Sequence, residues 1–235
     1  MKAIFLSFIV SLSLFGEGRV VLVHGFMNQR SMNTFNRLLK KNNWEVTNWK
    51  YPSRDKTISD HAHDLVIKLR EIPNDGKPTH LVGFSLGGLI IKAVLNDPDC
   101  PEHVKQGKVV LISSPLQGSK LARTLGKSNL MKRFFGNHAG RELYETPSGG
   151  FDKFGPFPKD TQLLIISGTF GFNPVFNGKN DGKVEIYESC PTIPHSHRFI
   201  PAGHSWICRN PEAFNLTLNF LESNNHHPSC SLKSP

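Results

Sequence analysis

One serine of this chain stands in unusual surroundings. Ser85 lies in the stretch Gly83-Phe84-Ser85-Leu86-Gly87, after an apolar strand-like run (79–82) and before an apolar helix-like run (86–95). In a strand–turn–helix of this kind the glycines leave room where strand and helix nearly touch, and the turn holds the hydroxyl clear of the sheet. The N–H of Leu86, at the helix start, can stabilise a developing oxyanion. The pattern predicts that Ser85 is a nucleophile and that Leu86 supplies one oxyanion donor.

A serine hydroxyl is a poor nucleophile until a base takes its proton, and the base needs a carboxylate to orient it. His204 follows the last predicted strand and is the candidate base. Asp181 lies between the strand at 162–167 and His204, and is the candidate acid. Asp152 and Asp160 are rival acids, although both precede that strand. We expect a triad of Ser85, Asp181 and His204.

The surrounding elements alternate between strand and helix. Apolar β-branched runs predict strands at 19–23, 44–49, 79–82, 108–112, 162–167 and 197–200, and helical spacing predicts helices at 31–41, 58–69, 86–95 and 211–221. Ser31 is a candidate N-cap of the first helix. Continuous apolar strands separated by helices are typical of a parallel sheet covered on both faces. The predicted fold is a three-layer α/β fold with a mostly parallel central sheet.

The segment 121–159 interrupts this alternation with glycines and phenylalanines. A long irregular segment inside a compact domain is usually functional or disordered, and the aromatic residues argue against disorder. We therefore expect a short cap or lid over Ser85, with basic residues around its mouth. The alternative is that the aromatic residues fill the core. The candidate substrate-binding residues are Phe134, Phe135, Phe151 and Phe154, with Phe157 beside them.

Several motifs resemble those of the α/β-hydrolase superfamily, especially its small lipases and esterases. The resemblance covers 20–221 and rests on Val23-His24-Gly25, Gly83-Phe84-Ser85-Leu86-Gly87-Gly88, Ser114-Pro115-Leu116-Gln117-Gly118-Ser119, Asn180-Asp181-Gly182-Lys183-Val184 and Gly203-His204. Phe84 and Ser114 depart from the more usual polar residue and threonine. The resemblance implies that the Phe26 N–H is the second oxyanion donor, that His24 shapes a loop, and that no cofactor is needed.

Metal binding is the weaker interpretation of the remaining polar clusters. His195 and His197 could chelate an ion, and 177–188 faintly imitates an EF-hand loop. Asn177 and Lys179 stand where that loop needs carboxylates, so calcium is disfavoured. We expect no metal.

Composition limits the remaining possibilities. The chain has 235 residues, 38% of them hydrophobic, which suits one domain, here 19–224 with a polar tail at 225–235. The formal net charge is +9, but the basic residues are scattered and form no dense basic helix, which argues against nucleic-acid binding.

The amino terminus fits a secretory signal peptide over residues 1–18. Lys2 precedes an uncharged apolar run, 3–15, that is shorter than the ~20 residues of a membrane span. A buried strand or helix of the mature fold is the alternative. We expect a secreted or periplasmic protein, in which the four cysteines (Cys100, Cys190, Cys208 and Cys230) meet an oxidising compartment and allow three pairings.

Together these features predict a serine hydrolase that cleaves small-molecule or lipid esters through an acyl-enzyme, with peripheral membrane contact as an option. A thioesterase or acyltransferase would use the same triad. A catalytically silent α/β-hydrolase scaffold used for binding is the alternative of a different class.

Overall fold

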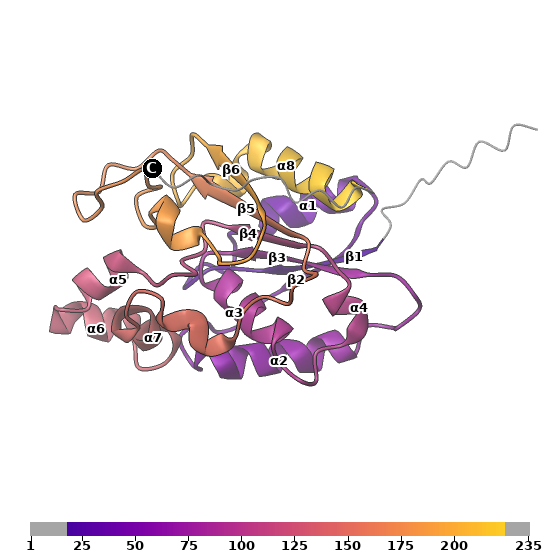
Figure 1. The fold of residues 1–235 in the computed structure, drawn as a ribbon, viewed down its shortest axis with the longest axis horizontal. Coiled ribbons are helices and arrows are strands. Elements are labelled where there is room, and N and C mark those ends of the chain that lie inside the picture. Colours follow the sequence, from indigo (N-terminus) through magenta and orange to yellow (C-terminus); the bar gives the residue numbers. More distant parts are fainter. Residues whose placement is uncertain (1–17, 224–235) are drawn as a thin grey trace, which may run out of the picture.

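The central element is a six-stranded parallel sheet with the strand order β2-β1-β3-β4-β5-β6 (Figure 1). This computed structural model describes residues 18–223. The strands are β1 (Arg19–Val23), β2 (Glu45–Trp49), β3 (Thr79–Phe84), β4 (Val109–Ile112), β5 (Leu163–Gly168) and β6 (Ser196–Ile200). All residues of β1, β3, β4 and β5 are buried, as their continuous apolar runs require in a sheet covered on both faces.

Helices cover both faces of the sheet and make three layers (Figure 1). They are α1 (Asn33–Lys41), α2 (Ile58–Arg70), α3 (Leu86–Leu95), α4 (Glu102–Lys105), α5 (Lys120–Leu125), α6 (Asn129–Phe135), α7 (Ala139–Glu145) and α8 (Pro211–Glu222), with 3₁₀ turns η1 (Gly150–Phe154), η2 (Ile186–Ser189) and η3 (Ile207–Arg209). One core lies between the sheet and α2 and α3, and a second lies between the sheet and α1 and α8. The predicted three-layer α/β fold is confirmed.

Local signals explain where two helices begin. Thr57 caps α2 through a reciprocal capping box with Asp60. Helix α1 begins at Asn33 with Met32 at the cap, because the Ser31 hydroxyl donates instead to the carbonyl of Asn28. The expected Ser31 cap is therefore wrong.

We expected the segment 121–159 to be irregular because of its glycines, but the structure has regular helices there. It contains most of α5 and all of α6, α7 and η1. These short helices gather beside the end of the sheet at which the strands finish (Figure 1). The segment is thus a small helical cap.

The sheet order identifies the place where a ligand can enter. The chain leaves β1 towards β2 and then returns to β3 on the other side of β1. Open parallel sheets bind ligands outside the carboxyl ends of their strands at such a switch point. His24 follows β1 and Ser85 follows β3, so both lie at this crevice.

The two ends of the chain lie outside the described residues. The expected signal peptide, apart from Gly18, and the tail 225–235, which contains Cys230, fall there. Within 18–223, no helix is both long and apolar enough to span a membrane. The cysteines of this part, Cys100, Cys190 and Cys208, are free thiols.

Candidate active site

Ser85 occupies a strained turn between β3 and α3. Its backbone has φ 53° and ψ −119°, a conformation that a residue with a side chain rarely adopts. The turn is held because the Ser85 N–H donates to the carbonyl of Ile112 over 2.9 Å. Backbone strain of this kind costs about 1–3 kcal/mol and persists where the surrounding structure enforces it. Here it directs the hydroxyl out of the sheet.

Close packing around the turn explains its glycines. A side chain at Gly83 would place its Cβ 2.7 Å from Ile91 Cδ1 and 2.9 Å from the backbone nitrogen of Gly88. A side chain at Gly87 would collide with the carbonyl of Val23 at the end of β1. Only glycine lets β3, α3 and β1 approach this closely.

The hydroxyl of Ser85 is the end of a hydrogen-bonded chain of three side chains. His204 Nε2 lies 3.2 Å from Ser85 Oγ, and His204 Nδ1 lies 2.8 Å from Asp181 Oδ2. The three residues come from the turn after β3, the loop after β5 and the loop after β6. The sequence-predicted residues Ser85, Asp181 and His204 are thus brought together, in the geometry that a base-activated serine needs.

The loop around Asp181 fixes its carboxylate. Asp181 Oδ1 accepts hydrogen bonds from the N–H groups of Lys183 and Val184, at 2.9 and 2.8 Å. The Asp181 carbonyl also accepts from the N–H of His204. Burial alone would raise the pKa of the Asp181 carboxyl, but the charge of His204, its hydrogen bond to the carboxylate and the hydrogen bond from the Lys183 N–H outweigh burial, so the pKa is lowered from the usual value. Asp181 is therefore ionised at neutral pH and can orient the imidazole.

Two backbone N–H groups flank Ser85. Leu86 begins α3, and Phe26 follows Gly25, whose Cβ, if present, would lie 3.1 Å from Ser85 Cβ. Among residues 18–223, neither N–H has a hydrogen-bond acceptor. Backbone donors are rarely left unpaired, so these two are available for a developing negative charge.

His24 supports the carboxyl end of β1 and is not part of the hydrogen-bonded chain that starts at Ser85. Its ring is fully buried and stacks on Tyr51, with ring centroids 4.1 Å apart. The Tyr51 hydroxyl donates to the His24 carbonyl over 2.8 Å. Burial lowers the pKa of His24, so the ring stays neutral. This placement agrees with the loop-shaping position that we expected.

The same architecture occurs in solved structures of lipases and esterases. A Bacillus licheniformis lipase, BlEst2 in its mature form, is 22% identical with a TM-score of 0.67, over 88% of this chain and 93% of that one. A metagenomic carboxyl esterase is 15% identical with a TM-score of 0.64, over 82% and 66%. A monoglyceride lipase of Saccharomyces cerevisiae is 16% identical with a TM-score of 0.56, over 88% and 85%.

This chain has the α/β-hydrolase fold. No family model and no curated protein sequence matches it. The similarity therefore lies in the α/β-hydrolase fold, because the sequences have diverged widely.

The aromatic residues of the α/β-hydrolase cap divide into two groups. Phe151, Phe154 and Phe157 are buried in the core between the sheet and α2 and α3. They fill that core and leave no open surface for a substrate, so the expectation that they line the pocket is corrected. The physical reason is that η1 and the chain just after it pack against the domain and bury these three rings.

Phe135 and Phe134 lie nearer the predicted oxyanion donor. Phe135 belongs to the same buried core as Phe151 and Phe154, and its ring stacks on that of Phe26 with centroids 5.8 Å apart. Phe134, its neighbour in α6, is 51% exposed. Phe134 contacts Phe135, with ring centroids 5.9 Å apart, and so lies one ring further from Phe26.

The rival acids lie away from His204. Asp152 pairs with the buried Lys92 ammonium over 3.0 Å, and Asp160 is exposed at a turn. The Lys92–Asp152 pair joins α3 to η1 and so has a structural role. Asp181 is the carboxylate that the fold brings to the imidazole.

Sequence reasoning missed a buried carboxylate, Glu188, that joins the cap to the loop of Asp181. It accepts from the N–H of Lys120 at the start of α5 and from the N–H of Glu185 in the Asp181 loop. Its own carbonyl accepts from the N–H of Gln117. Glu188 ends the stretch 177–188 that imitates an EF-hand loop, and its contacts with the cap join residues far apart in the sequence.

The residues weighed as metal ligands have protein partners instead. His197 Nε2 bonds Ser167 Oγ over 2.9 Å, and His195 Nδ1 bonds the carbonyl of Ile193 over 2.8 Å. Within residues 18–223, no cluster of three or more His, Cys, Asp or Glu side chains could hold a metal ion.

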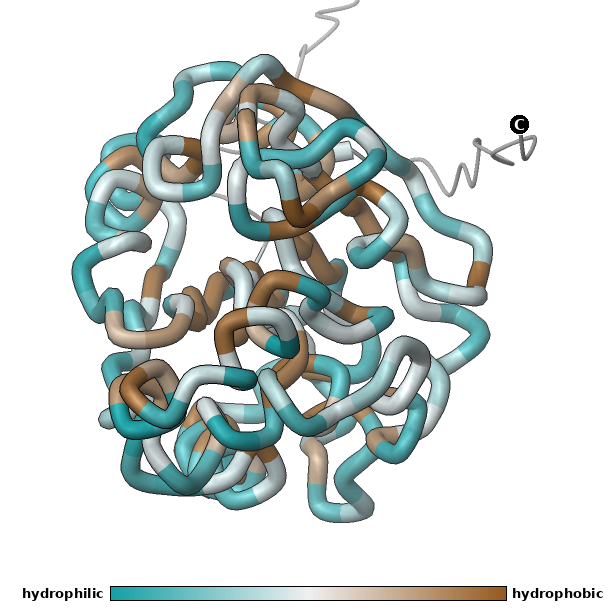
Figure 2. Tube along the Cα trace, turned by 90° about the vertical axis from the view of Figure 1, so that its left-hand side faces the viewer, coloured by the Kyte–Doolittle hydropathy of each residue, from teal (hydrophilic) through white to brown (hydrophobic). Residues whose placement is uncertain are grey.

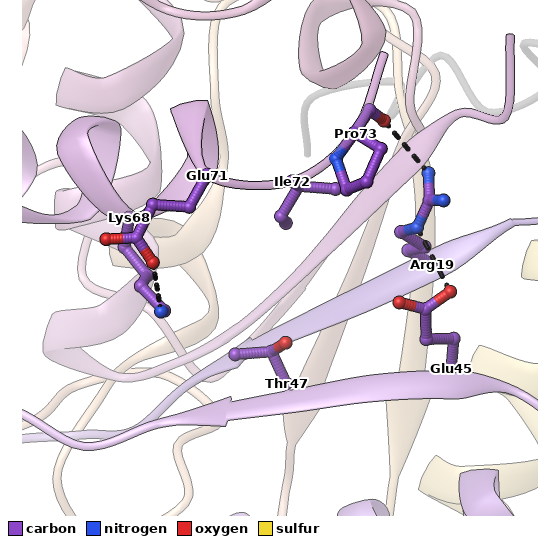
Figure 3. Close-up of a pocket in the computed structure, with 7 residues that line it drawn as sticks. All are labelled: Arg19, Glu45, Thr47, Lys68, Glu71, Ile72 and Pro73. Carbon is purple, nitrogen blue, oxygen red and sulfur yellow. Dashed lines mark hydrogen bonds and ion pairs between the residues drawn. The ribbon is translucent and has the colours of Figure 1, made fainter. Parts of the chain in front are cut away.

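A separate pocket of about 190 Å³ lies at the opposite end of the sheet, where β1 and β2 begin (Figure 3). Arg19 crosses it and bonds Glu45, Asp75 and the carbonyl of Pro73. Lys68 pairs with Glu71 beside it. These charges pair with one another, and the ion pairs of Arg19 link the amino ends of the strands.

Proposed function

We propose that this protein is a serine hydrolase that cleaves carboxylic esters through an acyl-enzyme. The observation that carries the proposal is the hydrogen-bonded chain Ser85–His204–Asp181 at the carboxyl edge of the sheet, beside two unpaired N–H groups. A scaffold used only for binding would not need a strained serine, a base at 3.2 Å and a buried carboxylate behind it.

In the first half-reaction, Ser85 Oγ attacks the ester carbonyl carbon while His204 Nε2 takes the hydroxyl proton. Asp181 stabilises the imidazolium that forms. The N–H groups of Phe26 and Leu86 stabilise the oxyanion of the tetrahedral intermediate, a contribution of about 3–4 kcal/mol per donor in comparable sites. The carbon–oxygen bond to the alcohol then breaks, and His204 gives its proton to the leaving alkoxide.

In the second half-reaction, water attacks the acyl-enzyme. His204 takes a proton from that water and later returns one to Ser85 Oγ, so the acid is released and the serine is regenerated. The chain's own residues supply every proton transfer of this scheme.

Exposed apolar side chains near the site support a lipid-like ester as substrate. Phe170 and Phe172 follow β5 and are 62% and 91% exposed, and Trp206 lies two residues after His204. Figure 2 faces this side of the molecule and shows hydrophobic stretches in its loops. Large apolar side chains exposed together mark interaction sites, which also supports contact with a lipid surface.

Labelling with a fluorophosphonate probe tests the proposal. The wild-type protein should be labelled and should hydrolyse 4-nitrophenyl esters, whereas a folded Ser85→Ala variant should lose labelling and lose several orders of magnitude in kcat/KM. A wild-type protein that resists the probe and leaves every ester intact would instead favour a binding scaffold.

A further inference from the structure

A groove of about 660 Å³ lies between α6 and the loop after β2. Its lining residues are Arg54, Leu130, Met131, Arg133 and Phe134. Three of them are apolar, two carry a guanidinium, and none is acidic. The groove thus combines an apolar wall with uncompensated positive charge.

The position of Arg54 is fixed by the end of α6. Its Nη2 donates to the carbonyl of Arg133 over 3.1 Å, and its guanidinium lies about 3.5–4.0 Å from where a Cβ on Gly136 would stand. Within residues 18–223, neither Arg54 nor Arg133 forms an ion pair with a carboxylate. The guanidinium of Arg54, held in this way, is preorganised for carboxylate or phosphate oxygens.

The apolar wall is exposed to an unusual degree. Leu130 is 75% exposed and Phe134 is 51% exposed, four residues apart on one side of α6. Residues at this spacing are neighbours on a helix surface. An alkyl chain laid along them would remove their apolar surface from water, which is favourable by about 25 cal/mol per Å².

Two sets of contacts connect the walls of the groove to the loop of Phe26. The Met27 N–H donates to Ser53 Oγ over 2.8 Å, which ties the loop that carries Arg54 to the chain after Phe26. On the other side, the ring of Phe134 contacts Phe135 at 5.9 Å, and Phe135 stacks on Phe26.

We propose that this groove binds an anionic amphiphile. Its carboxylate or phosphate lies against Arg54 and Arg133, and its alkyl chain lies across Leu130, Met131 and Phe134. The charge complementarity follows from two guanidinium groups without acidic neighbours in the lining. A dissolved fatty acid and a charged lipid headgroup share this chemistry, and the occupant that fits a groove of this volume is the single dissolved molecule. This binding does not require hydrolysis, so it stands or falls independently of the proposed function.

Calorimetric titration of the wild-type protein with dodecanoate, kept below its micellar concentration, tests the proposal. Dodecanamide is the neutral comparison, and vesicles of anionic phospholipid form a separate arm. Dodecanoate should bind more tightly than dodecanamide. Arg54→Gln and Arg133→Gln should each weaken dodecanoate binding about threefold, and the double variant about tenfold, because exposed charge contacts contribute about 0.2–1 kcal/mol each. Dodecanamide binding should stay unchanged in all variants.

Matched variants distinguish the effect of a lost charge on binding from an effect on folding. Arg54 also caps α6, so Arg133→Gln, which leaves that carbonyl in place, keeps the test independent of the cap. Lys41→Gln removes an exposed charge at the end of α1, just before β2 begins at the opposite edge of the sheet, and should leave dodecanoate binding unchanged. Equal weakening of dodecanoate and dodecanamide would overturn the proposal, and so would no weakening. Binding confined to vesicles would also overturn it, because the arginines would then recognise a lipid surface.

Discussion

The ring of Phe84 lies against the imidazole of His204, with centroids 4.8 Å apart and the planes inclined by 39°. Phe84 is the last residue of β3 and is buried beside the turn that carries Ser85. The apolar ring of Phe84 therefore packs against the imidazole, while Asp181 forms a hydrogen bond with it.

Replacing Phe84 with leucine should lower kcat for ester hydrolysis about tenfold, because the imidazole loses a flat wall and with it part of its fixed orientation. Steady-state kinetics and thermal unfolding on the same preparation check this. Phe35→Leu, a similar change in the core remote from His204, should lower stability by a comparable amount and leave kcat near normal. Equal kcat in both variants would contradict a positioning role.

Replacing Asp181 with asparagine should lower kcat by about 10⁴, since the amide favours the wrong imidazole tautomer and cannot stabilise the imidazolium. The measurement is kcat with a 4-nitrophenyl ester. Asp152→Asn and Asp160→Asn serve as controls and should stay within a factor of a few, because neither carboxylate approaches His204. Damage from Asp160→Asn alone would move the role to that residue.

Phe151→Ala should destabilise the fold by about 3–5 kcal/mol, the usual cost of emptying a fully buried aromatic site. Phe134→Ala, at a half-exposed position, should cost less than about 1 kcal/mol. Urea unfolding of both variants gives the comparison. A small loss for Phe151→Ala would show that the cap opens readily and would restore Phe151 as a pocket residue.

Buried neutral histidines should make the fold acid-sensitive. Burial lowers the pKa of His80 and of His197 to about 4. The unfolded chain, with a histidine pKa near 6.5, then binds more protons between about pH 6.5 and 4, so stability falls as the pH falls through that window. Each histidine should contribute about 1 kcal/mol per pH unit there.

The His80→Gln variant isolates one of these contributions. Glutamine keeps an acceptor for the Lys108 N–H, which now donates to His80 Nδ1 over 2.8 Å. Urea unfolding at pH 6 and at pH 5 measures how far the free energy of unfolding falls between the two pH values. This fall should be about 1 kcal/mol smaller in the variant than in wild type. An unaltered slope in His80→Gln would refute the assignment.

Local information was enough to predict the frame of the molecule. The strands and the long helices follow from short apolar runs and from helical spacing, which act within a few residues of the chain. The turn at Ser85 is equally local, because its glycines and its place between a strand and a helix are read directly from the sequence. The order Ser85, Asp181, His204 also came from the sequence, since each residue follows an element that the sequence predicts.

The structure of the cap does not follow from local sequence patterns. Its glycines and phenylalanines predicted a loose segment, and the structure has short helices there with Phe151 and Phe154 buried in the core. Whether a phenylalanine faces solvent, substrate or core depends on the side of the cap that docks against the domain. That choice is made by packing over long sequence separations, and no local pattern encodes it.

The supporting contacts of the site were likewise decided by the tertiary structure. Phe84 meets His204 and Glu188 meets Lys120 only because the sheet brings the ends of its strands to one edge. The groove at Arg54 needs α6 to lie over the loop after β2. The sequence determined which residues could perform chemistry and on which elements they lie, whereas the distances that join them arise when the parallel sheet forms and its loops pack against one another.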